Sequence, residues 1–283
     1  MRIRKLYFSV IFTFLVVITS CNQSIKTSEM YPWCIVAYDT VERTPNQRIK
    51  MIKDLGFSKY VYDWRDKHLK DSKNELKIAH ENNIEILGVW LWLNAKRDSL
   101  HTLSVANEQM LKVIEELDLS TTIWVSLSGN FFKDLNHKES LEKAVKYVDA
   151  ICEKAKKINC TVALYNHSGW FGNPLNEIEI IKALPEHHLS LVYNFHHAHN
   201  DIENFPTLIK QIAPYLSAVN LNGMKKGEKI YPLGKGAYEK EMILTLRENG
   251  FEGPWGILGH VENTDVKIIL EENLNGLNNL FKN

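Results

Sequence analysis

The sequence predicts a single (β/α)8 barrel, and the alternation of its apolar and amphipathic segments carries this prediction. Eight apolar, strand-like runs are separated by amphipathic, charge-rich segments, a pattern typical of crossover units that build a parallel sheet. Eight such units in roughly 230 residues match the size of a (β/α)8 barrel. A doubly wound sheet usually has fewer strands and a glycine-rich phosphate turn after the first one, and this sequence lacks that turn.

Each element is expected where its pattern is found. Continuous apolar runs indicate strands buried on both faces, and apolar residues that recur with a helical period indicate helices that cover the sheet. The expected strands are 33–38, 60–64, 84–93, 121–127, 161–165, 189–195, 218–221 and 254–258. The expected helices include 45–55, 105–117, 140–157, 178–184, 205–212 and 238–249. No low-complexity linker divides them, so one domain is expected.

The N-terminus has the pattern of a secretory signal. Arg2 and Arg4 precede an apolar run over residues 6–18, and Thr19-Ser20-Cys21 follows. This run is too short to span a membrane as a helix, and its basic start and small-residue end are typical of a cleaved signal. The cysteine directly after them resembles a bacterial lipobox, which predicts a lipid anchor on Cys21 and a location in the cell envelope, on the periplasmic or outer-membrane face. An ordinary signal peptide with an incidental cysteine is the alternative. The expected division is a signal peptide over 1–20, a polar tether over 21–31 and the barrel over 32–283.

Charge and cysteine content narrow the classes of partner. The formal net charge is +0, and no basic run is interleaved with aromatic residues, which argues against nucleic acid as a partner. Beyond Cys21, the sequence contains Cys34, Cys152 and Cys160. Three cysteines cannot all pair, and their spacing fits no metal site, so buried free thiols are expected.

Polar clusters follow four of the expected strands. The densest is the run 194–199, which contains His196, His197 and His199, and the others are 165–167, 220–222 and 260–262. In (β/α)8 barrels the chemistry lies at the C-terminal ends of the strands. These clusters are therefore expected to converge on one site, with His199 assigned to the following loop.

The last quarter of the chain resembles the xylose isomerase-like TIM-barrel superfamily. The resemblance lies in Pro-Leu-Gly-Lys-Gly at 232–236, the helix that follows, and the segment 249–257; residues 53–57 are similar to an early helix end of the same family. The similarity in pattern extends over most of residues 33–281. It implies a barrel that acts on sugars, in a family that includes isomerases, epimerases, dehydratases and lyases.

The resemblance also implies where the family's metal ligands would fall. The family places Glu, Asp, His and Glu on strands five to eight, and these positions correspond here to Tyr165, Asn194, Asn220 and Leu258. Divalent ions prefer carboxylate or imidazole ligands, so the usual metal site is predicted to be absent. The first three residues, together with Asn222, become candidates for substrate binding.

Strand parity suggests a replacement for that metal site. Residues two positions apart share one face of a strand, so His167, His196 and His260 are expected to point into the barrel mouth. Three imidazoles can bind zinc, manganese or a similar divalent ion and leave positions open for substrate. The alternative is a metal-free pocket in which these histidines bind sugar hydroxyls or act as acid and base.

Three further residues are candidates for catalysis. The resemblance places His197 at the histidine of the family's strand-six Asp-x-x-His motif, which implies that it faces the substrate. Lys225 could stabilise an enediolate oxyanion, although a loop lysine is usually only solvated. Glu262 could act as a base if burial raised its pKa.

Three residues are candidates for substrate contacts at the rim. Arg65 could bind a carboxylate or sugar hydroxyls through its guanidinium, or could pair with Asp63. Trp92 could offer an apolar face to a pyranose, although core packing is the commoner role of such residues. Trp170 could form a second aromatic wall.

The function predicted from these residues is proton abstraction beside a carbonyl of a sugar or keto-sugar. Isomerisation, epimerisation and β-elimination by a keto-glycoside lyase share an enediolate-like intermediate, and the sequence does not choose among them. An envelope location favours an unphosphorylated saccharide. The alternative is a non-catalytic saccharide-binding lipoprotein. Glycoside hydrolysis is disfavoured because pairs of strand-end carboxylates are scarce.

Overall fold

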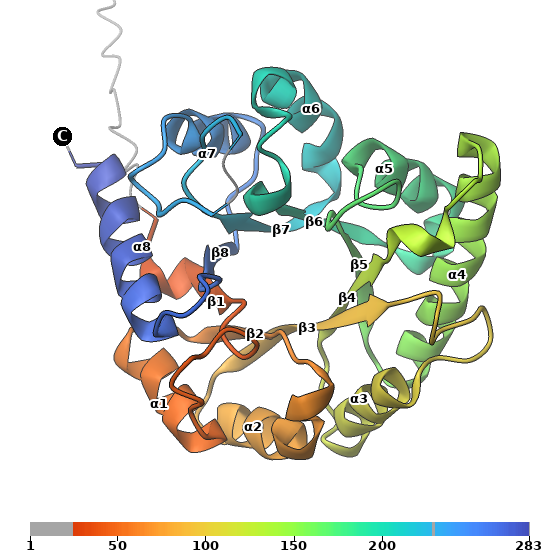
Figure 1. Ribbon diagram of the computed structural model, residues 1–283, viewed down its shortest axis with the longest axis horizontal. Coiled ribbons are helices and arrows are strands. Elements are labelled where there is room, and N and C mark those ends of the chain that lie inside the picture. Colours follow the sequence, from red (N-terminus) through yellow and green to blue (C-terminus); the bar gives the residue numbers. More distant parts are fainter. Residues whose placement is uncertain (1–24, 228–229, 283) are drawn as a thin grey trace, which may run out of the picture.

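Eight parallel strands form a nearly closed barrel inside a ring of helices (Figure 1). The computed structural model describes residues 25–227 and 230–282. The strand order is β1-β8-β7-β6-β5-β4-β3-β2, and the predicted (β/α)8 fold is confirmed. The strands are β1 (Met30–Trp33), β2 (Lys59–Tyr62), β3 (Glu85–Leu93), β4 (Thr122–Leu127), β5 (Thr161–Tyr165), β6 (Ser190–Asn194), β7 (Leu216–Leu221) and β8 (Trp255–Leu258). The helices are α1 (Pro45–Asp54), α2 (Leu69–Glu81), α3 (Val105–Glu116), α4 (His137–Lys157), α5 (Pro174–Ala183), α6 (Phe205–Ile212), α7 (Glu239–Glu248) and α8 (Val266–Leu280).

Most of the N-terminal predictions fall outside the described residues. The predicted signal peptide over 1–20 and the predicted anchor Cys21 both lie there, and the predicted tether over 21–31 overlaps β1 at Met30. Within residues 25–227 and 230–282, no helix is long and apolar enough to cross a membrane. Cys34, Cys152 and Cys160 are buried free thiols, as predicted.

The first strand ends earlier than the sequence pattern predicts. The apolar run continues to residue 38, but β1 stops at Trp33. Cys34 then has a φ of 56°, a left-handed conformation that breaks an extended strand. The N–H groups of Ile35 and Val36 donate to the buried carboxylate of Asp63 at 3.0 and 2.9 Å. A side chain that directly follows β2 therefore shapes the loop after β1.

Aromatic side chains fill the barrel interior. The ring of Trp33 lies 5.2 Å from that of Trp124 and 5.6 Å from that of Tyr165, measured between centroids. Gly88 makes room for this packing, because a Cβ there would lie 2.6 Å from the indole nitrogen of Trp124. The barrel is a packed core, which leaves its C-terminal rim as the place for a ligand.

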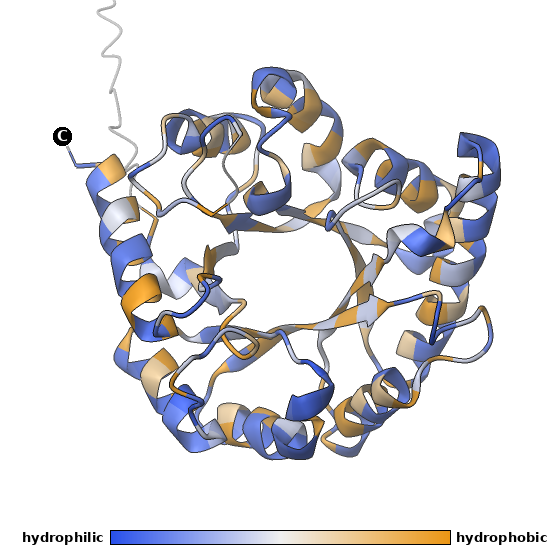
Figure 2. Ribbon diagram, in the orientation of Figure 1, coloured by the Kyte–Doolittle hydropathy of each residue, from blue (hydrophilic) through white to orange (hydrophobic). Residues whose placement is uncertain are grey.

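The helices bury one face against the barrel and expose the other, and Figure 2 shows hydrophilic and hydrophobic residues alternating along their ribbons. Capping residues set where they begin. Asn136 accepts the Glu139 N–H through its side chain at 3.1 Å, and the Glu139 carboxylate accepts the Asn136 N–H at 2.9 Å. This reciprocal capping satisfies two free donors and starts α4 at His137, before the predicted start at residue 140.

The turn at 232–236 has a structural role. Its Gly234 and Gly236 N–H groups donate to Oε1 of Glu239 at 3.1 and 2.9 Å, and the Met224 N–H donates to Oε2 at 3.0 Å. Glu239 is buried, and these three bonds satisfy its carboxylate. The motif that carries much of the family resemblance therefore holds the β7–α7 loop in place.

Candidate active site

Four histidines form a continuous row across the C-terminal mouth of the barrel. His167 follows β5, His197 and His196 follow β6, and His260 follows β8. Successive ring centroids along this row lie 4.5 Å (His167 to His197), 4.7 Å (His197 to His196) and 5.5 Å (His196 to His260) apart. The predicted convergence of the strand-five, strand-six and strand-eight clusters is thus observed, and we call these four residues the imidazole row.

Aromatic rings close both ends of the imidazole row. Trp92 lies 4.7 Å from His167 between ring centroids, and Tyr38 lies 3.5 Å from His260. Tyr38 was not predicted as a site residue, because the expected first strand placed it on a regular strand rather than on the loop that Asp63 shapes. Contacts on this loop depend on tertiary structure, and no local pattern signals them.

The turn after β6, and not the alternation of side chains along the strand, determines where His196 and His197 point. β6 ends at Asn194, and the 3-10 turn η5 (Phe195–His197) follows. The Asn194 side chain accepts the His196 N–H at 3.1 Å, which stabilises the turn. Phe195 is buried in the core, while His196 and His197 both reach the mouth. Parity correctly placed His196 there, but for the wrong reason, since the strand has already ended.

The layer beneath the imidazole row contains buried hydrogen bonds between neutral side chains, although the side-chain nitrogen of Asn220 is buried without a partner. Tyr165 Oη accepts from the side-chain amide of Asn194 and from the Trp33 indole N–H at 3.3 Å. Asn220 accepts from Tyr31 Oη at 2.8 Å. Burial raises the pKa of Tyr165 well above its ordinary value, so the phenol stays protonated. Tyr165, Asn194 and Asn220, which the resemblance places at the family's metal-ligand positions, thus make hydrogen bonds to neighbouring side chains.

Neither arrangement of residues in the mouth fits a divalent ion. The positions on strands five to eight present a phenol, two amides and, at Leu258, an alkyl chain, which are poor ligands. In the described chain, the ligand atoms of His167, His196 and His260 do not all three lie within 4.8 Å of one another. Among all the described residues, the one group of three whose ligand atoms lie this close together is Asp149, Glu186 and His187. Glu186 and His187 precede β6, at the opposite end of the barrel.

This geometry leads to a test of the predicted metal site. We expect protein purified after dialysis to hold far less than one zinc or manganese ion per chain, measured by plasma mass spectrometry. The control is His187→Ala, which removes the surface group. A stoichiometric ion that persists in this control and is lost in His196→Ala would show that the imidazoles rearrange to bind it.

Three adjoining cavities open around the imidazole row. The central cavity, of about 50 Å³, lies between the row and the floor formed by Tyr165 and Asn194. The tryptophan cavity, of about 250 Å³, lies beside Trp90 and Trp92. The amide cavity, of about 470 Å³, lies between the β5–α5 loop and α6. His167 lines all three, so it stands where they meet.

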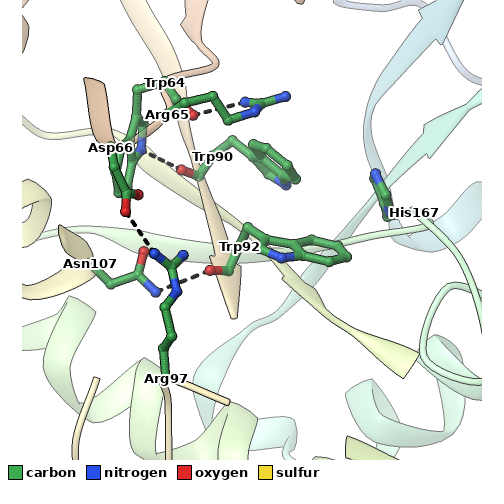
Figure 3. A pocket seen from close by; sticks show the side chains of 8 residues that line it. All are labelled: Trp64, Arg65, Asp66, Trp90, Trp92, Arg97, Asn107 and His167. Carbon is green, nitrogen blue, oxygen red and sulfur yellow. Dashed lines mark hydrogen bonds and ion pairs between the residues drawn. The ribbon is translucent and has the colours of Figure 1, made fainter. Parts of the chain in front are cut away.

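Arg65 lines both the central and the tryptophan cavities. Its guanidinium lies 4.6 Å from the centroid of the Trp90 ring and donates to the Trp64 carbonyl at 2.8 Å (Figure 3). The predicted alternative, a side-chain pair with Asp63, is not formed; Asp63 accepts backbone N–H groups instead. Among the described residues that line the central cavity there is no carboxylate. Arg65 therefore adds a positive charge to the lining of this cavity.

Several predicted site residues lie away from the cavities. Trp170 donates its indole N–H to His137 at 3.3 Å and packs on Phe132. Lys225 donates to Tyr231 Oη at 3.1 Å. Asn222 is buried behind the mouth, where it contacts His199 Nε2 at 3.3 Å. None of these three predicted residues lines the three described cavities.

His199 and Glu262 also have structural or peripheral positions. His199 is buried and bonds through Nδ1 to the Lys225 carbonyl at 2.8 Å, which ties the β6 loop to the β7 loop. Glu262 has a side chain that is 73% exposed and lies 3.5 Å from His260 Nε2. It lacks the burial that the predicted role as a base requires.

The electrostatic environment keeps His167 neutral. Burial, reinforced by His196, Arg65 and His260, lowers its pKa from 6.5 to about 4. The unfolded chain binds this proton near pH 6.5 and the folded chain binds it only near pH 4. The unfolded state therefore holds more protons in that window, and stability falls as the pH drops from about 6.5 to about 4.

We therefore expect His167→Asn to flatten the loss of stability in acid. Urea unfolding at several pH values between 4 and 7 would show a smaller decrease in the free energy of unfolding for the variant than for the parent. His68, whose pKa is also lowered to about 4, mainly by burial, contributes in both proteins and cancels in the difference. Identical slopes would contradict the assignment.

Comparison with protein families and solved structures shows which proteins this chain is similar to. The family described as xylose isomerase-like TIM barrel matches residues 37–275. No functionally curated protein matches the chain significantly. Among solved structures, a 3-keto-D-glucoside 4-epimerase from E. coli is 12% identical, with a TM-score of 0.65 over 89% of this chain and 98% of that one.

Two further solved structures have the same fold. A D-psicose 3-epimerase, crystallised in the presence of D-fructose, is 16% identical, with a TM-score of 0.62 over 88% of this chain and 96% of its own. The IolI protein, which contains a zinc atom, is 15% identical, with a TM-score of 0.65 over 89% of this chain and 95% of its own. The match to the family covers most of the chain, as the resemblance in the sequence implied. The chain belongs to the xylose isomerase-like TIM-barrel family.

Proposed function

We propose that this protein is a sugar-modifying enzyme that abstracts a proton beside the carbonyl of a sugar or keto-sugar. The observation that carries this proposal is the imidazole row, which lies at the catalytic end of the barrel and borders a central cavity with no carboxylate among its described lining residues. Imidazole is the side chain best suited to proton transfer near neutral pH. Simple binding of a saccharide does not require four adjacent imidazoles.

The two histidines where the cavities meet have different roles in this proposal. His197 lines the central and amide cavities and acts as the base that takes the proton. His167, with its pKa near 4, is too weak a base for this step. It remains neutral and donates a hydrogen bond to the carbonyl oxygen, as a neutral imidazole can do when it acts as an electrophile. Arg65 stabilises the negative charge of the enediolate.

Relatives of the same fold support a sugar as substrate, because two of them are named as sugar or keto-glucoside epimerases. An activity test in D2O distinguishes isomerisation, epimerisation and β-elimination. The protein is incubated in D2O with a panel of ketoses and 3-keto-glycosides, and NMR and mass spectrometry follow the carbon-bound protons. The expected result is deuterium incorporation at one position, with an epimer, isomer or unsaturated product identifying the reaction.

A non-catalytic saccharide-binding protein is the second candidate. The observation that favours it is the replacement of the family's ligand positions by Tyr165, Asn194, Asn220 and Leu258, the first three of which are engaged in internal hydrogen bonds. Tight binding of a saccharide in calorimetry, without deuterium incorporation into any member of the panel with or without added metal, would establish this candidate and overturn the enzyme.

We also propose that the protein works in the cell envelope, anchored through a lipid on Cys21, where an unphosphorylated saccharide is the available substrate. The small residues before Cys21 support this. Incorporation of labelled palmitate that is lost in Cys21→Ser would agree with the anchor, and unlabelled, freely released protein would contradict it.

A further inference from the structure

We propose that the substrate is a glycoside of two units, one held in the tryptophan cavity and one in the amide cavity, with the linkage between them beside His167. This inference rests on the proposed sugar specificity and adds the size of the substrate. The two cavities lie on either side of a shared residue, His167. A ligand that fills both must therefore pass His167, whereas a single ring would leave one of them empty.

The tryptophan cavity offers an apolar platform. Figure 3 shows the Trp92 indole extending toward His167, with Trp90 and Arg65 nearby. Asn107 holds the Trp92 backbone by donating to its carbonyl at 3.1 Å, so the indole is supported from behind. An indole face packs against the C–H face of a pyranose, and the nearby guanidinium binds its hydroxyls.

At the outer wall of this cavity, Arg97 pairs with Asp66 at 2.7 Å. Both side chains are exposed, at 44% and 60%. Their charges are neutralised by each other, so they restrict the cavity without adding a net charge. The tryptophan cavity is therefore shaped for one sugar ring with its apolar face on Trp92.

The amide cavity has a different chemistry. One face of α6 lines this cavity with Asn204, Thr207 and Gln211. Asn204 directly precedes the helix, and the three residues are spaced three and four positions apart, which places them on one face. They are exposed and uncharged. Ser168, on the facing β5–α5 loop, and Leu175, at the start of α5, complete this side.

Uncharged amides and hydroxyls bind sugar hydroxyls as both donors and acceptors. Leu175 is 39% exposed and offers an apolar contact next to them. The carboxylate among the described lining residues is that of Asp201, which precedes α6 in the chain. A second, neutral sugar unit fits this combination better than a phosphate or another anion would.

The cavity volumes agree with a ligand of two units. Binding sites for small molecules commonly measure about 300–1,000 Å³. The tryptophan cavity, at about 250 Å³, falls below this range, whereas the amide cavity adds about 470 Å³. Their different linings make the site asymmetric, so the two units of the glycoside are expected to bind in one orientation.

The test measures binding and does not depend on turnover. Calorimetry compares disaccharides (trehalose, sucrose, cellobiose and lactose, each with its 3-keto derivative) with methyl glucoside and its 3-keto derivative. The expected result is that at least one disaccharide binds more tightly than the matched methyl glycoside. The double variant Thr207→Ala/Gln211→Ala is expected to weaken the binding of the disaccharide by about tenfold, as the loss of two hydrogen bonds would. Its affinity for the methyl glycoside is expected to stay unchanged.

Two control variants complete the experiment. Trp92→Ala is expected to lower the affinity for both classes of ligand. Lys210→Ala, which changes an exposed neighbour on α6, is expected to lower the affinity for neither. Equal affinity for disaccharides and methyl glycosides, no binding of any disaccharide, or an equal effect of the α6 double variant on both classes would overturn the inference. Disaccharide-selective binding without deuterium incorporation would overturn the proposed enzyme and leave this inference standing.

Discussion

His197→Asn is expected to lower kcat/KM for deuterium incorporation by about 10²–10⁴-fold, the usual contribution of a general acid or base. His197 lies 4.5 Å from His167 between ring centroids and lines the central and amide cavities. Asparagine preserves polarity and hydrogen bonding but cannot accept a proton near neutral pH. We expect kcat to fall much more than the affinity for the substrate.

The matched control is His188→Asn. His188 is exposed at the opposite end of β6 and has a φ of 50°, which asparagine adopts readily. The control should keep the activity of the parent. The assignment of His197 is wrong if both variants retain activity, and a role in folding instead of catalysis is indicated if His197→Asn also unfolds at lower urea concentration.

Arg48→Met is expected to reduce the free energy of unfolding by about 3–5 kcal/mol, because it leaves a buried carboxylate without its counter-charge. Arg48 Nη1 lies 2.5 Å from Glu75 Oε2, and the two side chains are 6% and 1% exposed. Tyr60 Oη donates to the other oxygen of Glu75 at 2.6 Å. This network joins α1, α2 and β2 beneath the loops that carry Tyr38 and Arg65.

Urea unfolding with a double variant separates the charge from the packing. Arg48→Met/Glu75→Gln removes both charges and should recover much of the lost stability. Lys50→Met, on the same helix but in an exposed pair with Asp54, should change the unfolding midpoint little, since exposed pairs contribute weakly. If Arg48→Met and Lys50→Met have the same effect, the buried pair does not stabilise the fold.

The resemblance to the family and the alternation of segments predicted the barrel, because each strand and helix has a local hydrophobic period that a sequence displays. The same reasoning predicted the candidate site. The polar clusters after β5, β6 and β8 were expected to meet, and parallel strands of one barrel bring their C-terminal ends together whatever the loops do. His167, His196, His197 and His260 were found in this way.

The hydrophobic periodicity of single segments could not predict the contacts that the loops make. Tyr38 packs on His260 because Asp63 accepts the N–H groups after β1, a contact between the segments that follow two different strands. Trp170 and Lys225 were predicted in the site from their positions just beyond strand ends, but each found a partner elsewhere, in His137 and Tyr231. A side chain beyond a strand points where its turn and its neighbours direct it.

The sequence by itself determined the barrel and predicted the end of it that carries the candidate site, since these depend on the order and type of residues. Tertiary structure decided the rest. It joined the histidines into a row, left Arg65 beside Trp90 instead of paired with Asp63, and opened two cavities of different chemistry on either side of His167. These features depend on distances between residues far apart in the chain, which packing sets and periodicity does not.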